Sequence, residues 1–331
     1  MGRHYTLCPL SCNVHQQRAC QSARVNLILT QSRDGCSQKG FGMRYPNLDQ
    51  FLAAERASLA KGPVAMILAE DNVEVDTTLR HHLDIGFAPV ILLAAPELEL
   101  PAELEAKIAR VDTQVFETGI LQRMVNALIA AAPGTWLFYC YNAEYLFFPF
   151  LEQRKVGEML AFHTEERREA MISYVIDIYA ENLTAHPNAV SLDTAHLDKT
   201  GYYALAREDG ANNWAHRERQ LDFYGGLRWR FEEYMPWTRR RIDRIALFRA
   251  KPGLTLREDF TLSDEEMNTY ACPWHNNLTT AIASFRTAKA LRANPGSRFA
   301  INTYIWQNST AFEWHSQQLM DLGLMEPGQW F

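Results

Sequence analysis

The chain has 331 residues, of which 47% are hydrophobic and 22% are charged, and its formal net charge is −6. This composition is typical of a folded globular protein, and the negative charge argues against nucleic acid as a partner, because binding to a phosphate backbone depends on basic residues. Apolar runs such as 90–95 fall far short of the ~20 residues that span a bilayer, so we expect no transmembrane segment.

Residues 1–43 differ from the rest of the chain, with five basic residues against one acidic residue and four of the six cysteines. We expect residues 1–44 to be a disordered extension, or upstream sequence translated from a mis-assigned start with Met43 as the first residue. Three alternatives stay open. A zinc site would need closer cysteine pairs than the spacings of four, eight and sixteen. A targeting peptide fits the arginine-rich balance, and the first residues match a myristoylation pattern.

Only two cysteines, Cys140 and Cys272, lie in the remaining sequence. They do not form a disulfide framework, and this scarcity is typical of a protein from a reducing compartment. We therefore expect a cytoplasmic location.

Strands and helices alternate in the first half of the chain. Short apolar runs predict strands buried on both faces, and stripes of apolar residues at helical spacing predict the helices between them. We expect strands at 64–69, 89–94, 114–117 and from Trp136, and helices from Val75 to a stop at Gly86, at 101–111 and at 120–132. This alternation predicts an α/β protein with a mostly parallel, doubly wound sheet flanked by helices.

The second half is less regular. It should contain a charged helix at 156–170, strands at 171–180 and 242–250, and a helix at 278–293, with turn-rich sequence at 181–235. Because no repeat or linker interrupts it, we expect residues 45–331 to form a single domain.

Two predicted strands end in polar residues. Glu70-Asp71-Asn72 follow the strand at 64–69, and Asn142 and Glu144 follow the strand from Trp136. Parallel strands bring these ends to one edge of the sheet, where open α/β sheets bind ligands. The alternative is that each cluster only caps a loop or helix. The sequence lacks GxxxxGK[ST], HExxH and GxSxG motifs and a GxGxxG after a strand, which argues against P-loop, zincin, serine-hydrolase and dinucleotide sites.

Several segments resemble GT-A-type glycosyltransferases of the family 2 kind, found in bacterial polysaccharide clusters. In that family the first strand ends in Asn-Glu, a helix closes with His-x-x-x-Gly-Phe, and a later strand leads into Asp-x-Asp-Glu-Phe-Leu. The matching segments are Glu70-Asp71-Asn72, His82 to Phe87, and Trp136 with Tyr141-Asn142-Ala143-Glu144-Tyr145-Leu146. Further matches are Gln122, Asn126, Pro149, Arg154, Asp177-Ile178-Tyr179 and Gly225 to Arg230. The resemblance spans residues 60–290 and implies a GT-A-like (Rossmann-like) fold.

The Asp-x-Asp motif is degenerate here. In the family its two aspartates hold Mg²⁺ or Mn²⁺, which bridges the diphosphate of a nucleotide-sugar. This chain has Tyr141 and Ala143 at those positions and keeps one carboxylate, Glu144. The resemblance leaves three possibilities: a weaker Mg²⁺ or Mn²⁺ site using Glu144 and His275, a metal-free site, or a protein that has lost transfer chemistry.

The resemblance also assigns roles to individual residues. Glu70 and Asn72 would contact the nucleoside, and Asn142 with Glu144 would lie at the diphosphate. In a metal-free site, Arg228, Arg230 and His275 would supply positive charge, with Lys289 as a lesser candidate. Asp177, inside an apolar strand, is the candidate base that deprotonates the acceptor, with a structural carboxylate as its alternative role. The tail aromatics Trp306, Phe312, Trp314 and Trp330 would form an acceptor platform or pack in the core.

The leading hypothesis is a glycosyltransferase of the hexosyltransferase type that moves a sugar from a nucleotide-sugar donor to a polysaccharide or lipid-linked acceptor. A catalytically inactive GT-A-like protein that binds nucleotide or glycan is the first alternative. An enzyme of unrelated nucleotide chemistry on a Rossmann-like sheet is the second, because fold does not fix function.

Overall fold

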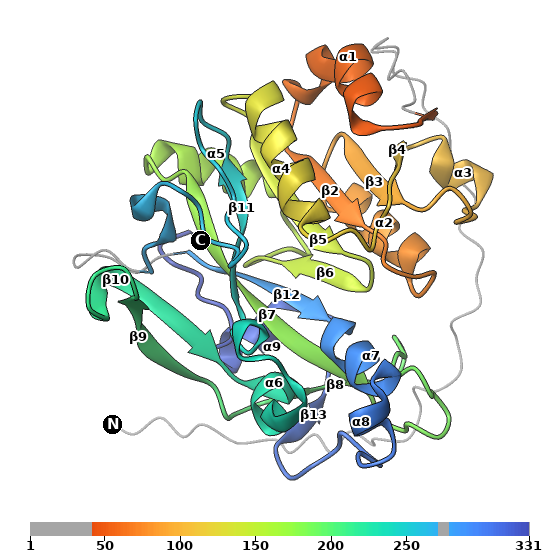
Figure 1. Ribbon diagram of the computed structural model, residues 1–331, viewed down its shortest axis with the longest axis vertical. Helices are drawn as coiled ribbons and strands as arrows, with labels where there is room; N and C mark the ends of the chain where they lie inside the picture. The colour runs from red at the N-terminus through yellow and green to blue at the C-terminus, as the bar shows by residue number, and fades with distance from the viewer. Residues whose placement is uncertain (1–41, 271–277, 331) are drawn as a thin grey trace, which may run out of the picture. The chain divides into compact units, whose positions relative to one another are not determined.

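A mixed sheet of eleven strands forms the centre of the protein (Figure 1). The computed structural model describes residues 42–270 and 278–330, which belong to one compact unit, Gly40–Phe331. The predicted extension over residues 1–44 lies almost wholly outside the described residues. The predicted α/β class, with a Rossmann-like sheet flanked by helices, is confirmed.

Five parallel strands form the first half of the sheet, in the order β1-β4-β3-β2-β5. Their bounds are β1 (Met43–Tyr45), β2 (Val64–Leu68), β3 (Val90–Ala94), β4 (Ala109–Asp112) and β5 (Trp136–Tyr141). The helices between them are α1 (Leu48–Leu59), α2 (Val75–Asp84), α3 (Ala102–Glu105) and α4 (Ile120–Ala131). α1 contacts α4 and α2 contacts α3, the arrangement that right-handed crossovers would give, and β2 and β3 are buried throughout.

The strand order reverses at β2. From β2 the chain winds outward through β3 and β4, and then returns to place β5 on the other side of β2. This is a topological switch point, the position in open α/β sheets where ligands bind at the carboxyl ends of the strands. The fold therefore puts the loop after β2 beside the loop after β5.

A corner at Asn142–Ala143 carries the chain from the first half of the sheet to the second. β5 ends at Tyr141, and after two intervening residues the chain begins β6 (Glu144–Phe147), at the far end of the strand order. Ala143 adopts a left-handed backbone, with φ of 57°, and its carbonyl accepts a hydrogen bond from the Phe285 N–H. One continuous segment thus belongs to both halves.

The second half of the sheet is built around one long strand, β7 (Ala170–Ala180). It pairs antiparallel with β11 and β8 and parallel with β12, which pairs antiparallel with β6. The remaining strands of this half are β8 (Ala195–Asp198), β11 (Asp243–Arg249), β12 (Thr280–Ser284) and β13 (Ser309–Ala311). Its helices are α5 (Val156–Glu165), α7 (Arg286–Ala293), α8 (Pro295–Arg298) and α9 (Ser316–Asp321).

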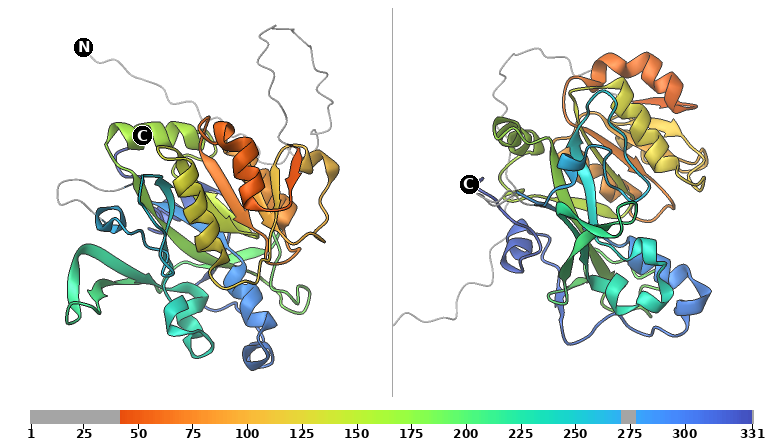
Figure 2. Two further views of the ribbon diagram at one scale, coloured as in Figure 1. Left: turned by 45° about the horizontal axis from the view of Figure 1, so that its top comes forward. Right: turned by 60° about the vertical axis from the view of Figure 1, so that its left-hand side comes forward.

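A two-stranded hairpin lies apart from the sheet and projects from it in Figure 1 and in the left view of Figure 2. It consists of β9 (Tyr203–Asp209) and β10 (Ala215–Tyr224), and it leads into the short helix α6 (Gly226–Arg230). Three 3-10 turns complete the described structure: η1 (Glu232–Tyr234), η2 (Trp237–Arg239) and η3 (Glu265–Asn268).

Most predicted strands and helices are confirmed, although the helix predicted at 156–170 ends at Glu165, and three other elements are corrected. The predicted helix at 101–111 ends at Glu105, and its last residues form β4, whereas the predicted strand at 114–117 is a loop. The predicted helix at 278–293 divides into β12 and α7. In both predicted helices a short apolar run pairs with neighbouring strands, and periodicity alone does not distinguish such a run from a buried helical turn.

Candidate functional site at the switch point

The residues at the switch point come from three separate parts of the chain. The loop after β2 supplies Glu70, Asp71 and Asn72, and the end of β5 supplies Tyr141 and Asn142. The third part is α7, which begins directly after β12. The close-set side chains from these three segments form what we call the switch-point cluster: Glu70, Asp71, Tyr141, Asn142, Arg286 and Lys289.

An ion pair between Glu70 and Arg286 joins the first and third segments. The Arg286 Nε and Nη2 atoms each donate to one carboxylate oxygen of Glu70, at 2.7 Å. The guanidinium carbon lies 3.7 Å from the ring centroid of Tyr141, so the cation stacks on the aromatic face. Both partners stay about one-quarter exposed, at 27% for Glu70 and 24% for Arg286. This pair is thus ordered and open to solvent.

Asn142 fixes the loop after β2. Its side-chain oxygen accepts from the Glu70 N–H at 2.9 Å, and its amide nitrogen donates to Asp71 Oδ1 at 2.6 Å and to the Val73 carbonyl. Asp71 also binds Lys289, with Nζ 2.9 and 3.0 Å from its two oxygens. Asn142 is fully buried, whereas Asn72 is exposed on the loop. The predicted residues Glu70 and Asn142 are therefore brought together, with Asn142 ordering the loop that carries Glu70.

Glu144 is fully buried behind this cluster and is saturated with hydrogen bonds. Its Oε2 accepts from Arg244 at 2.8 Å and from the Tyr141 N–H at 2.9 Å, and its Oε1 accepts from Arg244 at 3.2 Å and Ser284 at 3.0 Å. Burial alone would raise the pKa of Glu144, but the charge and hydrogen bonds of Arg244 outweigh it and lower that pKa to about 2. Glu144 therefore joins β5, β6, β11 and β12 as a permanent anion.

These residues do not fit a divalent metal ion. Both Glu144 oxygens are occupied, the Tyr141 ring is covered by Arg286, and Ala143 offers no ligand. No group of three His, Cys, Asp or Glu side chains with the spacing of a metal site occurs within residues 42–270 and 278–330. The other predicted metal ligand, His275, lies outside the described residues.

Asp177 lies on β7 at the same level as this cluster. In the sheet register Asp177 pairs with Ser284, which in turn pairs with Glu144. Its Oδ2 accepts from the Arg228 N–H at 3.3 Å, and its Oδ1 lies 3.4 Å from Arg228 Nε. Among the described residues, no donor forms a hydrogen bond with Oδ1. Burial raises the pKa of Asp177, and Arg228 only partly offsets this effect.

Arg228 and Arg230 bind other parts of the protein. Arg228 donates to Thr287 and to the Arg241 carbonyl, while Arg230 binds Asp198 and the Tyr304 carbonyl. Burial lowers the pKa of Arg228, and Asp177 opposes that effect. Both arginines hold α6 against the second half of the sheet.

Two glycines allow α6 to approach β7. Gly225 has φ of 155° and Gly226 has φ of 63°, values that side chains disfavour. A Cβ at Gly225 would meet the Tyr202 ring at 2.2 Å, and one at Gly226 would meet Asp177 Oδ2 at 3.1 Å. The turn therefore seals Asp177 from solvent, and its side chain is 0% exposed.

The tail aromatics pack against the rest of the protein, which is the second of the two roles predicted for them. Trp314 packs against Tyr145 and Phe312, Trp330 packs against Phe148, and Trp306 donates to Asp198. Large exposed apolar side chains gather elsewhere, on the hairpin and the segment after it: Tyr203, Leu205, Trp214, Trp229 and Trp237.

Sequence reasoning missed Arg286 and Arg244. Arg286 was not identified because residues 278–293 match the pattern of one helix. A strand that ends at Ser284 would have placed Arg286 at the carboxyl edge of the sheet. Arg244 lies within the predicted strand 242–250 and carries no motif. Lys289, predicted as a lesser candidate, does belong to the switch-point cluster.

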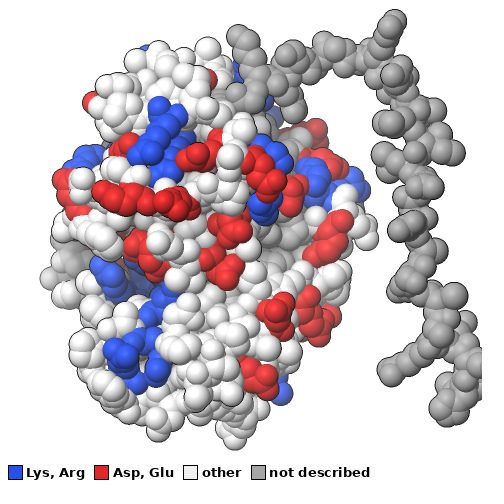
Figure 3. Space-filling model, turned by 90° about the vertical axis from the view of Figure 1, so that its right-hand side faces the viewer, with Lys and Arg blue, Asp and Glu red and all other residues white. Residues whose placement is uncertain are grey.

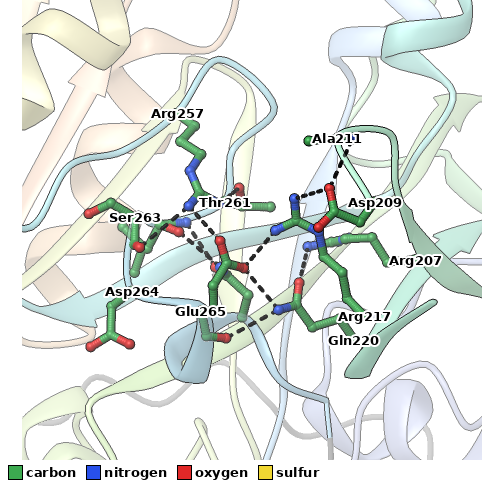
Figure 4. A network of polar contacts seen from close by, with 12 residues as sticks. Arg207, Asp209, Ala211, Arg217, Gln220, Arg257, Thr261, Ser263, Asp264 and Glu265 are labelled. Atoms are coloured by element: carbon green, nitrogen blue, oxygen red, sulfur yellow. Dashed lines mark hydrogen bonds and ion pairs between the residues drawn. The ribbon is translucent and has the colours of Figure 1, made fainter. Parts of the chain in front are cut away.

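A second polar cluster lies away from the switch point and attaches the hairpin (Figure 4). Glu265 accepts hydrogen bonds from Arg257 at 2.5 Å, Arg217 at 2.8 Å and Gln220 at 3.0 Å. Burial alone would raise the pKa of Glu265, but these donors lower it to about 2. We call this group the Glu265 cluster: Arg217, Gln220, Arg257 and Glu265.

Acidic side chains form a broad band across the middle of the face shown in Figure 3, with basic side chains interspersed. Within the described part of the chain, no helix is long and apolar enough to cross a membrane. A scan against protein-family models finds no match, and a search of curated proteins finds none either.

Proposed function

We propose that this protein is a GT-A-like glycosyltransferase of the hexosyltransferase type. It would bind a nucleotide-sugar at the switch point and transfer the sugar to a polysaccharide or lipid-linked acceptor during polysaccharide biosynthesis. The short motifs that resemble family 2 glycosyltransferases support the choice of donor. A cytoplasmic location belongs to the same proposal, and the free, buried thiol of Cys140 suits a reducing compartment.

The observation that carries the proposal is the switch-point cluster itself. Its side chains converge from three distant segments on the edge of the sheet where α/β proteins bind ligands, and two of these segments supply the charged ones. Ion pairs that serve only the core are more deeply buried, as Glu144–Arg244 is, with exposures of 0% and 4%. The Glu70–Arg286 pair is instead accessible, as a binding group must be.

The donor would lie along this edge. Glu70 and Asn72 would contact the nucleoside, because their loop is fixed by Asn142 and reaches solvent. Asn142 and Glu144 would hold the strand ends and the loop after β2 in place beneath the diphosphate. Arg228 and Arg230 would act indirectly by holding α6, and His275 stays a predicted contact.

Asp177 is the proposed base of an inverting transfer. It would take the proton of the acceptor hydroxyl while that oxygen bonds to the anomeric carbon and the nucleoside diphosphate leaves with the electrons of the broken bond. Its raised pKa and its Oδ1 without a donor among the described residues suit this role. Because the Gly225–Gly226 turn seals Asp177, the acceptor has to displace that turn.

A catalytically inactive nucleotide- or glycan-binding protein is the second candidate. One observation favours this candidate. Glu144 is the single carboxylate left in the degenerate motif, and its oxygens already accept hydrogen bonds from Arg244, Ser284 and the Tyr141 N–H. Asp177 would then serve only to cap α6 through the Arg228 N–H.

Thermal melts with a panel of nucleotide-sugars test the proposal. A donor at a hundred times its dissociation constant should stabilise the protein by about 2.7 kcal/mol. Transfer or slow hydrolysis of that donor should then be lost in Asp177→Asn, which should still bind the donor. Asp193→Asn, an exposed aspartate in the loop before β8, is the matched control.

Each outcome has one meaning. Binding with turnover that depends on Asp177 supports the transferase. Binding without turnover of any panel donor supports the inactive binding protein. The absence of any stabilisation by nucleotide-sugars or free nucleotides, with or without Mn²⁺, would overturn the transferase and the nucleotide-binding form of the second candidate, and leave only glycan binding.

A further inference from the structure

The degenerate Asp-x-Asp motif does not hold a metal ion, so positive charge for a bound diphosphate is lacking at this position of the switch point. A nucleotide diphosphate carries negative charge that a metal ion or a fixed cation must balance as the leaving group forms. Glu144 cannot ligate a metal ion without giving up Arg244, Ser284 and the Tyr141 N–H, which hold both of its oxygens. The balancing charge must therefore come from another group.

Arg286 is placed to supply that charge. It lies on the ring of Tyr141, the residue that stands where the family motif has its first aspartate. A guanidinium has five N–H donors, and its planar fork matches pairs of phosphate oxygens. The bonds to Glu70 use Nε and one hydrogen of Nη2. Among the described residues, Nη1 has no hydrogen-bond partner, and it is not one of the atoms sealed from solvent.

The surroundings of Arg286 fix its orientation. Glu70 holds one edge of the guanidinium, and Tyr141 supports one face, so the remaining edge is presented to solvent in a single direction. Lys289, one turn further along α7, adds a second cation near Asp71. The N-terminus of α7 contributes a partial positive charge on the same side.

We propose that Arg286, stacked on Tyr141, binds the diphosphate of the nucleotide donor in place of a divalent metal ion. This inference rests on the proposed function, because it names the group that recognises the donor. The ligand class is a nucleoside diphosphate, and its binding does not require Mg²⁺ or Mn²⁺.

Calorimetric titration of the full chain tests this inference. The probes are UDP, GDP and ADP, together with the best nucleotide-sugar from the panel, each titrated in EDTA and in Mn²⁺. The wild-type affinity should be the same in both conditions. In Arg286→Gln the affinity in EDTA should fall about 10- to 100-fold, the loss of a charge-assisted hydrogen bond.

Two further variants keep the result interpretable. Arg80→Gln removes an exposed, ion-paired arginine on α2 and should bind as the wild type does. Arg286→Lys keeps the charge but loses the fork, and should bind between the wild type and Arg286→Gln. A melting temperature close to that of the wild type shows that each variant is folded.

The outcomes separate this inference from the proposed function. Binding in Mn²⁺ but not in EDTA, or undiminished binding by Arg286→Gln, would overturn the role of Arg286 and leave the transferase proposal standing. The absence of binding by the wild type in every condition would overturn both.

Discussion

At the scale of single residues, Glu144 shows how a carboxylate at a strand end can serve the fold. It begins β6, and its bonds reach Arg244 on β11, Ser284 on β12 and the backbone of β5. The ion pair with Arg244 is fully desolvated, with exposures of 0% and 4%. Removing one partner of such a pair leaves an uncompensated buried charge.

We expect Glu144→Gln to lower the free energy of unfolding by about 3–5 kcal/mol at neutral pH, because Arg244 loses its counter-charge. Urea denaturation measures this change. Glu103→Gln, which removes an exposed partner of Arg80, should change the free energy of unfolding far less, because solvent screens this pair. Equal effects of the two substitutions would contradict the buried role of Glu144.

The low pKa of Glu144 also predicts how the stability of the protein depends on pH. The folded pKa of Glu144, about 2, lies below its ordinary value of 4.5, so its stabilising contribution is complete above about pH 4.5 and is lost as the pH falls towards 2. The stability difference between wild type and Glu144→Gln should therefore shrink over that range.

The sequence predicted the location of the site better than its contacts. Glu70 and Asn142 were identifiable because polar residues directly after apolar strands stand out in the sequence. Arg286 and Lys289, which pair with Glu70 and Asp71, come from a segment more than two hundred residues further along the chain. No local pattern encodes such a pairing, which depends on the order of strands in the sheet.

At the scale of elements, the hairpin β9–β10 is held mainly by polar contacts. The Glu265 cluster joins β10 to the segments before and within η3, as Figure 4 shows, and Arg207 adds ion pairs to Asp222 and Asp243. Phe223, packed against Tyr174 and Tyr270, is an apolar anchor. An element held in this way should open more easily than the central strands.

We expect Glu265→Gln to increase amide hydrogen exchange across β9 and β10 and to leave β2 and β3 unchanged. The substitution removes the charge that holds Arg257 and Arg217. Hydrogen–deuterium exchange with mass spectrometry measures the effect. Glu258→Gln, an exposed position in the same loop, is the control. Unchanged exchange in the hairpin would show that the apolar anchor suffices.

Element boundaries were predictable where apolar runs were long and isolated, as at β2, β3 and β7. They were not predictable where a strand runs directly into a helix, as at β12 and α7, since Ile282, Phe285 and Ala288 keep a helical spacing across the boundary. The hairpin was not predicted, because β9 is largely exposed and shows no alternation of buried and exposed residues.

At the scale of the whole molecule, the corner at Asn142–Ala143 ties the two halves of the sheet together. The parallel half ends with β5, and the segment continues directly into β6 beyond β12. Glu144 at the start of β6 then bonds to both halves. Neither half can be separated without breaking this segment from one of them.

We therefore expect residues 42–330 to unfold in a single cooperative transition. In differential scanning calorimetry the calorimetric and van't Hoff enthalpies should agree, as they do for two-state domains. Glu144→Gln should move the transition to lower temperature and keep it single. Two resolved peaks for the wild type would contradict the coupling of the halves.

The corner also restricts how this protein can move. Many ligand-binding proteins close by rotating one rigid lobe on another about a hinge of a few residues. Here the segment that would have to bend lies at the switch point and is bound on both sides, by the Leu68 carbonyl at Asn142 and by the Phe285 N–H at Ala143. A lobe rotation is thus blocked at the place where a ligand would bind, and any closure would have to come from local movements such as displacement of the buried Gly225–Gly226 turn.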